Sequence, residues 1–230
     1  LLSAGDVVGV YRIRHRLGVG GMAEVWSAEH TQLGTLHAVK VLLRASEPLR
    51  ARLIREGRAQ ARLRHPHIVP MHDILDLDGI PALVMPQISG PTLRAVLAAG
   101  PLREPDALAL FHAILSGVAH AHRCGFVHRD LKPANVLLDC RADQLIARVA
   151  DFGLVKELSA TAYTAGGMTM GTPAYAAPEQ LRDAAAADAR ADLFSLGVLL
   201  AEMLTGQRPF AGHTLDAITA AHASPPQLDA

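Results

Sequence analysis

The sequence predicts an α+β chain in two parts, the first built mainly from strands and the second mainly from helices. Up to about Ile88 the apolar residues alternate or form short runs, which is typical of strands. After Gly90-Pro91 they recur with a helical period, most clearly from Pro105 to Arg123. Because this change of period coincides with a Gly-Pro break, we expect domains at 1–88 and 89–230.

The composition is that of a folded chain with a substantial core. Half of the 230 residues are apolar and 19% are charged, which excludes general disorder. Lys plus Arg number 22, as do Asp plus Glu, so charge gives no support for binding nucleic acid or a membrane surface. No apolar run reaches the ~18 residues of a membrane span, and Cys124 and Cys140 lack metal-ligand spacing. These features favour a reduced, cytosolic setting. The start carries neither a signal-peptide pattern nor an initiator Met, so we expect a fragment of a longer chain.

Five strands and one helix are expected in the first part. Residues 11–17 alternate, which places Tyr11, Ile13, His15 and Leu17 on one face of a half-buried strand. Further strands are predicted at 25–28, 36–42, 68–71 and 80–85, with a turn at 76–79. A helix should begin near Ser46 and end before His65-Pro66.

The second part should begin with a short helix at 92–97 and a long amphipathic helix at 105–123. The apolar face of the long helix is predicted to carry Leu108, Phe111, Leu115, Val118 and His122. Short strands follow at 136–138 and 145–150, and then a long loop at 154–174 without periodicity. The most hydrophobic helix is expected at 184–205, ended by Gly206, and a last helix from Thr214 to about Ala223.

One segment, His128-Arg129-Asp130-Leu131-Lys132-Pro133-Ala134-Asn135, holds the residues with the clearest chemistry. Asp130 can accept a proton from a hydroxyl, Lys132 can neutralise a phosphate, and Asn135 can bind a divalent metal through its side-chain oxygen. This set suits phosphoryl transfer, in which positioning and charge stabilisation supply nearly all of the catalysis. The pattern is long, which favours this interpretation over a chance match in a charged surface loop.

A Gly-rich turn, Gly18-Val19-Gly20-Gly21-Met22-Ala23, precedes the predicted strand at 25–28. The backbone N–H groups of such a turn can approach phosphates closely, although an ordinary hairpin turn has a similar composition. A dinucleotide-binding turn would open a helix. Here a second strand follows instead, which is the strand–loop–strand arrangement of a loop that covers the phosphates of a nucleotide.

Charged residues downstream extend the candidate site. Lys40 lies between apolar neighbours, where its ammonium either binds phosphates or extends from a sheet edge into solvent. Glu56 on the following helix is the candidate partner of Lys40, although spacing alone favours a solvated carboxylate paired with Arg52 or Arg55. Asp151, in Asp151-Phe152-Gly153, follows a predicted hairpin and is the expected Mg²⁺ ligand.

These motifs resemble, in kind and in order, those of the protein kinase superfamily, most closely the bacterial serine/threonine protein kinases. The resemblance runs from Gly9 to Phe210 and rests on segments 18–22, 37–40, 55–56 with 65–69, 128–135, 151–153, 171–179 and 192–197. It implies a two-lobed kinase fold. The first lobe would hold an antiparallel five-stranded sheet and helix αC, and the mainly helical second lobe would stop after helix αG.

The resemblance also implies cofactors and residue roles. The cofactors are ATP and Mg²⁺, with Mn²⁺ as an alternative metal. Asp130 would deprotonate the substrate hydroxyl, Lys132 would contact the γ-phosphate, and Asn135 and Asp151 would bind the metal. Asp192 would brace the catalytic segment. The implied nucleotide contacts, including a gatekeeper at 85 and a hinge at 86–88, are Leu17, Gly18, Gly20, Gly21, Val25, Ala38, Lys40, Glu56, Met85, Gln87, Ile88 and Leu137.

The regulation implied by the resemblance centres on Arg129, which would pair with a phosphate in the loop after Asp-Phe-Gly. Thr164 is the first candidate for phosphorylation and Thr169 and Thr161 follow, although each is as readily an ordinary loop threonine. Lys132, together with Thr172, is similar to serine/threonine-specific kinases. The implied partners are protein substrates with Ser or Thr and a second copy of the chain, in a transient dimer for autophosphorylation in trans. Nucleic acid and membranes are not implied.

Three departures from the family pattern stand out. Ala23 replaces the third glycine of the turn, and Gln60 stands where a hydrophobic residue is usual. The chain also stops before the last helices of the family and before the arginine that would pair with Glu179. Because an unpaired buried carboxylate costs several kcal/mol, we expect these residues to be less stable than a longer chain.

Two other functions compete with a protein kinase. A pseudokinase, a scaffold on the same fold, would have lost one of the four key residues, Lys40, Asp130, Asn135 or Asp151, and none is lost. A small-molecule phosphotransferase of kinase type would not be expected to combine Asp-Phe-Gly with Ala177-Pro178-Glu179.

Overall fold

The computed structural model describes residues 2–20, 23–43, 47–141, 144–152, 173–183, 187–210, 212 and 215–224, without the side chains of a few of them. The chain divides into two compact units. Unit 1 comprises Leu1–His65 and Val69–Ile88, and unit 2 comprises Pro66–Ile68 and Ser89–Ala230. Within the described ranges no helix has the length and apolar character needed to cross a membrane.

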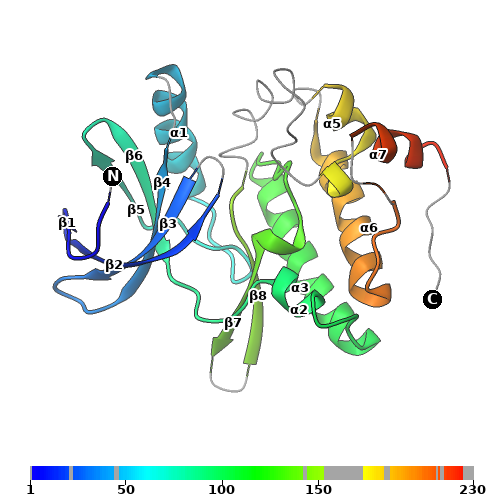
Figure 1. Cartoon of the computed structure of the whole chain (residues 1–230), viewed down its shortest axis with the longest axis horizontal. Helices are drawn as coiled ribbons and strands as arrows, with labels where there is room; N and C mark the ends of the chain where they lie inside the picture. Colours follow the sequence, from blue (N-terminus) through cyan, green and yellow to red (C-terminus); the bar gives the residue numbers. More distant parts are fainter. Residues whose placement is uncertain are drawn as a thin grey trace. The chain divides into compact units, whose positions relative to one another are not determined.

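The described residues of unit 1 form an antiparallel sheet of six strands with one helix (Figure 1). The spatial order of the strands is β1-β2-β3-β4-β6-β5. Short loops join consecutive strands, as expected for hairpins, and only helix α1 (Glu47–Gln60) interrupts their succession. The strands are β1 (Val7–Val8), β2 (Tyr11–Val19), β3 (Ala23–His30), β4 (Leu36–Leu42), β5 (Asp73–Leu77) and β6 (Ile80–Pro86).

Three details of unit 1 correct the sequence predictions. The sheet has a sixth strand, β1, which at two residues is too short to show a period. The strand expected at 68–71 is wrong, because the strand that pairs with β6 is β5 and Ile68 instead bridges to Val149 of unit 2. His15 and Leu17 are exposed rather than half-buried, because irregularities in the β2–β3 register interrupt the alternation after Ile13.

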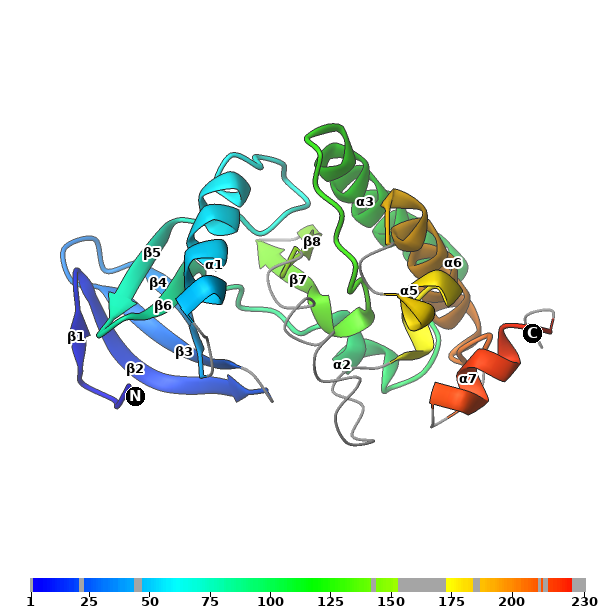
Figure 2. The same cartoon turned by 90° about the horizontal axis from the view of Figure 1, so that it is seen from above.

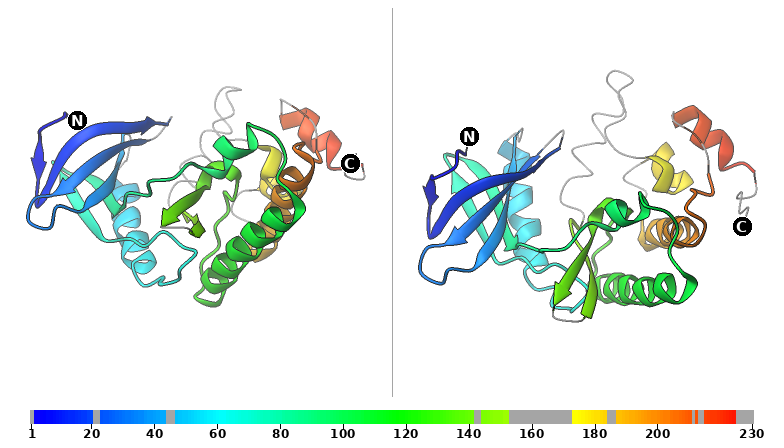
Figure 3. Two further views of the ribbon diagram at one scale, coloured as in Figure 1. Left: turned by 90° about the horizontal axis from the view of Figure 1, so that it is seen from below. Right: turned by 60° about the horizontal axis from the view of Figure 1, so that its bottom comes forward.

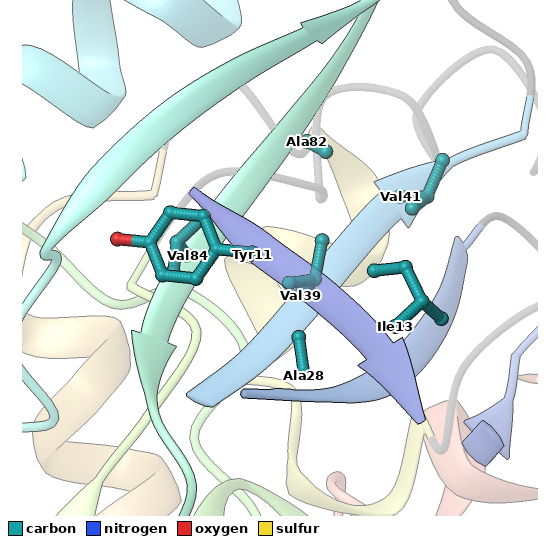
Figure 4. Packing of buried hydrophobic residues seen from close by; sticks show 7 residues of the cluster. All are labelled: Tyr11, Ile13, Ala28, Val39, Val41, Ala82 and Val84. Carbon is teal, nitrogen blue, oxygen red and sulfur yellow. The ribbon is translucent and has the colours of Figure 1, made fainter. Parts of the chain in front are cut away.

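The two faces of the sheet serve different purposes. One face carries a buried cluster of Tyr11, Ile13, Ala28, Val39, Val41, Ala82 and Val84 (Figure 4). Since side chains alternate along a strand, Lys40 points away from this cluster, to the face that carries its cross-strand partner Leu83. Helix α1 covers that second face (Figure 2). A Cβ atom on Gly57 of α1 would lie 2.9 Å from a methyl of Ile74 and 3.5 Å from one of Leu83.

Unit 2 is mainly helical, with one hairpin (Figure 3). Helix α3 (Glu104–Arg123) packs against α6 (Ala189–Thr205) and against β8 of the hairpin. Residues 66–68 also belong here, since the N–H of Val149 donates to the carbonyl of His67. The remaining elements are α2 (Leu93–Leu97), η1 (Pro133–Asn135), β7 (Val136–Arg141), β8 (Gln144–Val149), η2 (Pro173–Tyr175), α5 (Pro178–Arg182) and α7 (Leu215–Ala221).

Helices α2, α3, α6 and α7 of unit 2 lie close to where the sequence predicts them, whereas α5 was not predicted, and two further details differ. The buried stripe of α3 consists of Ala107, Leu110, Ile114, Gly117, Val118 and Ala121, whereas Leu108 is exposed. Small residues turn inward because the contact is close: a Cβ on Gly117 would lie 2.7 Å from the carbonyl oxygen of His67. Helix α6 begins at Ala189 rather than 184, since the side chain of Asp188 caps it. It ends as predicted at Gly206, which has φ of 73°.

Candidate active site

The catalytic segment brings the three predicted catalytic side chains into direct contact. Nζ of Lys132 donates to Oδ2 of Asp130 at 2.7 Å, and Nδ2 of Asn135 approaches the same oxygen at 3.2 Å. Nδ2 of Asn135 also donates to the backbone carbonyl of Asp130 at 2.8 Å. An ammonium and an amide therefore crowd Oδ2, and Oδ1 is the oxygen left to meet a substrate. The carboxylate stays partly exposed, so a substrate can reach it.

A buried carboxylate on α6 holds the backbone of this segment. Asp192 is fully buried, and its Oδ2 and Oδ1 accept the N–H groups of His128 and Arg129, each at 2.7 Å. Oδ2 also lies 2.7 Å from Nε2 of His122 on α3. Since a carboxylate oxygen only accepts, Nε2 of His122 is the donor. Asp192 thus braces the segment, as the family resemblance implies. The sequence analysis placed His122 on the apolar face of this helix and did not predict its contact with Asp192.

His128 links the segment to the end of the hairpin. Its Nε2 lies 2.9 Å from the carbonyl of Ala150, so this nitrogen carries the proton. Its Nδ1 accepts a hydrogen bond from the N–H of Asp130 at 3.2 Å, so both ring nitrogens have a partner. The ring also packs on Phe152, with centroids 4.7 Å apart. The position of Asp151, between Ala150 and Phe152, is therefore tied to the catalytic segment.

Two non-glycine residues of the site have positive φ, Arg129 at 64° and Asp151 at 62°. Such conformations are uncommon for residues with a Cβ and persist where the surroundings enforce them. Arg129 is enforced from both sides. Asp192 accepts its N–H, and Nε2 of Gln180 on α5 donates to its carbonyl at 3.0 Å. The sequence gives no signal for Gln180, because its partner lies 51 positions away in the chain.

The donors suit a hard divalent cation such as Mg²⁺. Asn135 uses its amide nitrogen on Asp130, which leaves its amide oxygen for a metal, and Asp151 contributes a carboxylate. The N–H of Ala150 donates to the carbonyl of Asn135, so the two predicted ligands belong to connected segments. Among the described residues no three His, Cys, Asp or Glu side chains gather as a metal site. Mg²⁺ commonly takes one or two protein ligands and completes its shell with phosphates and water.

The predicted nucleotide-binding residues of unit 1 lie on one face of the sheet and in the turn after β2. Lys40 is 8% exposed, on the α1 side of the sheet, and Ala38 two residues earlier shares its face. Gly18 and Gly20 lie where β2 turns toward β3, and a Cβ on Gly18 would meet no atom within 4 Å. Internal packing therefore does not require a glycine at Gly18, whereas the approach of a ligand would. Leu17 is 44% exposed.

The predicted hinge follows β6. Met85 pairs with Ala38 in the sheet. The N–H of Gln87 donates to the carbonyl of Leu36, and its side chain accepts the hydroxyl of Ser27 at 2.7 Å. Those two groups of Gln87 are engaged within the sheet, so contacts to an adenine would come from other backbone groups at 86–88. Leu137, half-buried on β7, and Val25 on β3 are the remaining apolar candidates.

Several predicted residues are not described. The backbone of Glu56 lies in α1, but its side chain is outside the described part of the molecule. The predicted nucleotide contact Gly21 and Gly153 of Asp-Phe-Gly also lie outside the described residues. So do the predicted phosphorylation sites Thr161, Thr164 and Thr169, and Thr172, which is similar to serine/threonine-specific kinases.

Comparison with known proteins identifies the family. The model of the protein kinase domain matches residues 11–227. The chain belongs to the protein kinase family. This confirms the resemblance seen in the motifs and the two-lobed kinase fold, apart from the extra strand β1.

Curated proteins similar to this kinase domain include bacterial serine/threonine-protein kinases. It is 37% identical over 227 residues to the serine/threonine-protein kinase PrkC of Bacillus subtilis. The match covers 96% of the present chain and 34% of PrkC. It is 39% identical over 206 residues to PknL of Mycobacterium tuberculosis, covering 88% of the chain and 51% of PknL. The chain thus spans about a third to a half of these curated relatives.

Solved structures agree with the fold. The PknI kinase domain of Mycobacterium tuberculosis superposes with a TM-score of 0.73 at 29% identity. That match covers 96% of the present chain and 86% of the PknI chain. Rad53, in complex with AMP-PNP, gives a TM-score of 0.76 at 29% identity over 92% of the present chain and 53% of the Rad53 chain.

Proposed function

We propose that this domain transfers the γ-phosphoryl group of ATP to serine or threonine hydroxyls of proteins. The observation that carries the proposal is the arrangement around Asp130. Lys132 and Asn135 both contact Oδ2, which leaves Oδ1 oriented for a substrate hydroxyl, as a catalytic base requires. The specificity for serine and threonine follows the names of the relatives PrkC and PknL.

The residues of unit 2 have separable tasks in this reaction. Asp130 orients the substrate hydroxyl and receives its proton as the oxygen attacks the γ-phosphorus. Lys132, held beside Asp130, places a positive charge where the transferred group becomes more negative. Asn135 and Asp151 would hold Mg²⁺, or Mn²⁺ in its place. When bound, the metal neutralises negative charge on the phosphates.

The residues of unit 1 would bind the nucleotide. Lys40, paired with Glu56, would contact the phosphates, and the open position at Gly18, with Gly20 in the turn beside it, would let backbone N–H groups approach them. The exposed side chain of Leu17 is suited to cover an adenine ring. A scaffold without catalysis is not favoured, because Lys40 and the catalytic residues of unit 2 are all present.

Regulation by phosphorylation of the loop before Gly171 is part of the proposal. Arg129 lies directly beside the catalytic base and would pair with a phosphate on Thr164, Thr169 or Thr161. The loop would be modified by a second copy of the domain in a transient dimer. Incubation with ATP and Mg²⁺ followed by mass spectrometry should find phosphate within 161–172. A fully active enzyme with an unmodified loop would exclude this form of regulation.

The proposed reaction needs the ATP pool of the cell interior. Cys124 and Cys140 are both exposed free thiols, which supports a reducing compartment. We therefore place the activity in the cytoplasm, with protein substrates and without a contact between this segment and a membrane.

Transfer of ³²P from ATP to myelin basic protein tests the function. The wild-type domain should label the substrate, and Asp130→Asn should lower the rate by about 10²–10⁴-fold, the usual contribution of a general base. Asp106→Asn, a change of the same kind at an exposed carboxylate of α3, should leave the rate unchanged. Equal labelling by wild type and Asp130→Asn would remove Asp130 from its role. No labelling by wild type would reject the kinase assignment for this segment.

A further inference from the structure

Gln180 is a buried polar residue of unit 2 that makes two directed hydrogen bonds. It lies on the short helix α5 and is 7% exposed. Its Oε1 accepts the N–H of Ala177, the N-cap of α5, at 3.1 Å. Its Nε2 donates to the carbonyl of Arg129 in the catalytic segment at 3.0 Å. The first bond stabilises the start of a helix, and the second connects that helix to the residue before the catalytic base.

The second bond acts on one particular peptide group, the one between Arg129 and Asp130. Its carbonyl is held by Gln180, and its N–H is held by Nδ1 of His128 at 3.2 Å. This peptide group carries the Cα of Asp130, so its orientation determines where the carboxylate points. The peptide group before it is held by Asp192, which accepts the N–H of Arg129. Gln180 therefore completes the set of side chains that fix the backbone on both sides of Arg129.

The conformation of Arg129 explains why such a donor is needed. A residue with a Cβ at φ of 64° has a strained backbone that persists only where its surroundings enforce it. Without a donor on its carbonyl, the peptide group that follows is free to rotate toward an unstrained orientation. Rotation would also break the bond between the N–H of Asp130 and His128, and would turn the carboxylate away from its working position.

We propose that Gln180 is a positioning residue for phosphoryl transfer: its carboxamide fixes the Arg129–Asp130 peptide group and thereby aims Asp130 at the substrate hydroxyl. This role rests on the proposed kinase function. It also distinguishes Gln180 from an ordinary helix cap. At the capping position Gln and Glu serve equally, because both offer an acceptor to the N-cap N–H. Only Gln offers a donor to the carbonyl of Arg129.

The test compares Gln180→Glu and Gln180→Met with the wild-type domain. Both variants should lower kcat on the order of 10²-fold, the effect of misplacing a catalytic group by about 1 Å. The KM for ATP should stay within about twofold, since no nucleotide contact is removed. A carboxyl group at this buried place would titrate above its usual pKa, and its protonated form can donate to the carbonyl of Arg129. The rate of Gln180→Glu relative to wild type should therefore rise from about pH 8 to about pH 6, whereas that of Gln180→Met should not.

Ser195→Ala provides a matched control. Ser195 is 2% exposed on α6, and its hydroxyl donates to the carbonyl of Tyr175, in the segment just before α5. The variant thus loses a buried hydrogen bond of the same kind without touching the catalytic segment. It should lower the melting temperature about as much as Gln180→Met but leave kcat within about twofold of wild type. Amide hydrogen exchange at Asp130 should accelerate in Gln180→Met and not in Ser195→Ala.

Three outcomes would overturn the role of Gln180. One is a kcat of Gln180→Met no lower than that of Ser195→Ala, and another is a Gln180→Glu variant as active as wild type at every pH. The third is unchanged exchange at Asp130 in both Gln180 variants. A wild-type domain that does not transfer phosphate would instead reject the kinase function itself. In that case the exchange measurement still decides whether Gln180 fixes the peptide group.

Discussion

The two units position their charged residues in different ways. In unit 1 the register of the sheet places Lys40, since the alternation along β4 and its pairing with β6 decide the face on which the ammonium lies. In unit 2 no regular element carries Asp130. Its position depends on hydrogen bonds from Asp192 on α6, His128 and Gln180 on α5 to the backbone of one irregular segment.

The difference has a physical consequence for substitutions. A sheet register is maintained by many backbone hydrogen bonds, so one side chain can change without moving the strand. The catalytic segment has few backbone partners of its own and depends on individual side chains, most of them buried. Loss of one such side chain leaves buried N–H or C=O groups without a partner, which affects both stability and geometry.

The largest effect is expected for Asp192→Asn. In the wild type the two carboxylate oxygens accept hydrogen bonds from His128, Arg129 and His122. The amide of the variant keeps one acceptor oxygen, and its NH₂ group takes the place of the other. Unfolding should become easier by about 2–4 kcal/mol, because at least one charge-assisted bond is lost in a fully buried place and the amide NH₂ then faces a buried donor. Phosphate transfer should fall as well. Denaturant titration followed by circular dichroism measures the first effect, and the ³²P assay measures the second.

The same helix offers a matched control in Asp188→Asn. Asp188 caps the start of α6 from an exposed position, and Asn is as good a cap as Asp. Both the unfolding free energy and the transfer rate should stay close to those of wild type. If both aspartate variants were equally stable, the brace from α6 would not hold the catalytic segment.

Lys40→Met is expected to have the next largest effect, and on activity alone. The transfer rate should fall by roughly 10²–10³-fold, because a positive charge at the phosphates is lost. The unfolding free energy should change less than in Asp192→Asn, since Met fits a nearly buried position and many backbone hydrogen bonds hold the register of β4. Lys40→Arg is the control that retains the charge. A Lys40→Met variant that lost as much stability as Asp192→Asn would contradict the distinction between the two units.

The same distinction explains how much the sequence could predict. The strand at 36–42 was predicted with its observed bounds, because the run of apolar residues that predicts it is a local property. The long helices and the stop at Gly206 were likewise readable from spacing and turn chemistry. The motifs supplied Asp130, Lys132 and Asn135, which the structure brings together.

What the sequence could not predict depends on contacts between distant segments. Gln180 bonds to Arg129 across 51 positions and His122 bonds to Asp192 across 70, and no pattern in the sequence connects either pair. The strand expected at 68–71 failed for the same reason, since Ile68 finds its partner Val149 in unit 2. The inner stripe of α3 was misjudged because its packing partners select the buried face, and at Gly117 the backbone of His67 leaves no room for a Cβ.

A smaller effect is expected when the pH is lowered, and it should be centred on unit 1. His37 is 7% exposed, and its Nδ1 lies 3.4 Å from Nδ1 of His72. The ring of His37 packs against Tyr11 and lies near His30. Burial, and then the neighbouring His72 and His30, lower the pKa of His37, and burial lowers the pKa of His72. Burial, and then Asp73, raise the pKa of Tyr11, so its hydroxyl stays neutral in this range.

The sign of the pH effect follows from these directions. A histidine whose pKa is lower in the folded state binds fewer protons there than in the unfolded chain, so its contribution to stability is complete above about pH 6.5 and declines as the pH falls. The melting temperature should therefore decrease from about pH 7 to about pH 5, and hydrogen exchange in β4 should accelerate. His72→Gln should flatten this dependence by removing one titrating ring. An equally steep dependence in His72→Gln would show that other groups cause it.

The smallest predicted effect is a gain in stability from His222→Phe in unit 2. The ring of His222 meets Phe194 and Phe210 edge to face, with centroids 5.1 and 4.7 Å away. Both ring nitrogens are buried, and within the described residues neither has a hydrogen-bond partner. Burial lowers the pKa of His222, partly offset by the carboxylate of Glu179. A phenyl ring keeps the aromatic contacts and removes the unpaired nitrogens, so unfolding should require about 1 kcal/mol more. His112→Phe, the same change at an exposed place on α3, should bring no gain. If His222→Phe melts at a lower temperature than wild type, the ring nitrogens of His222 must form hydrogen bonds in solution. Unit 2 would then depend on a single polar side chain at this aromatic contact as well.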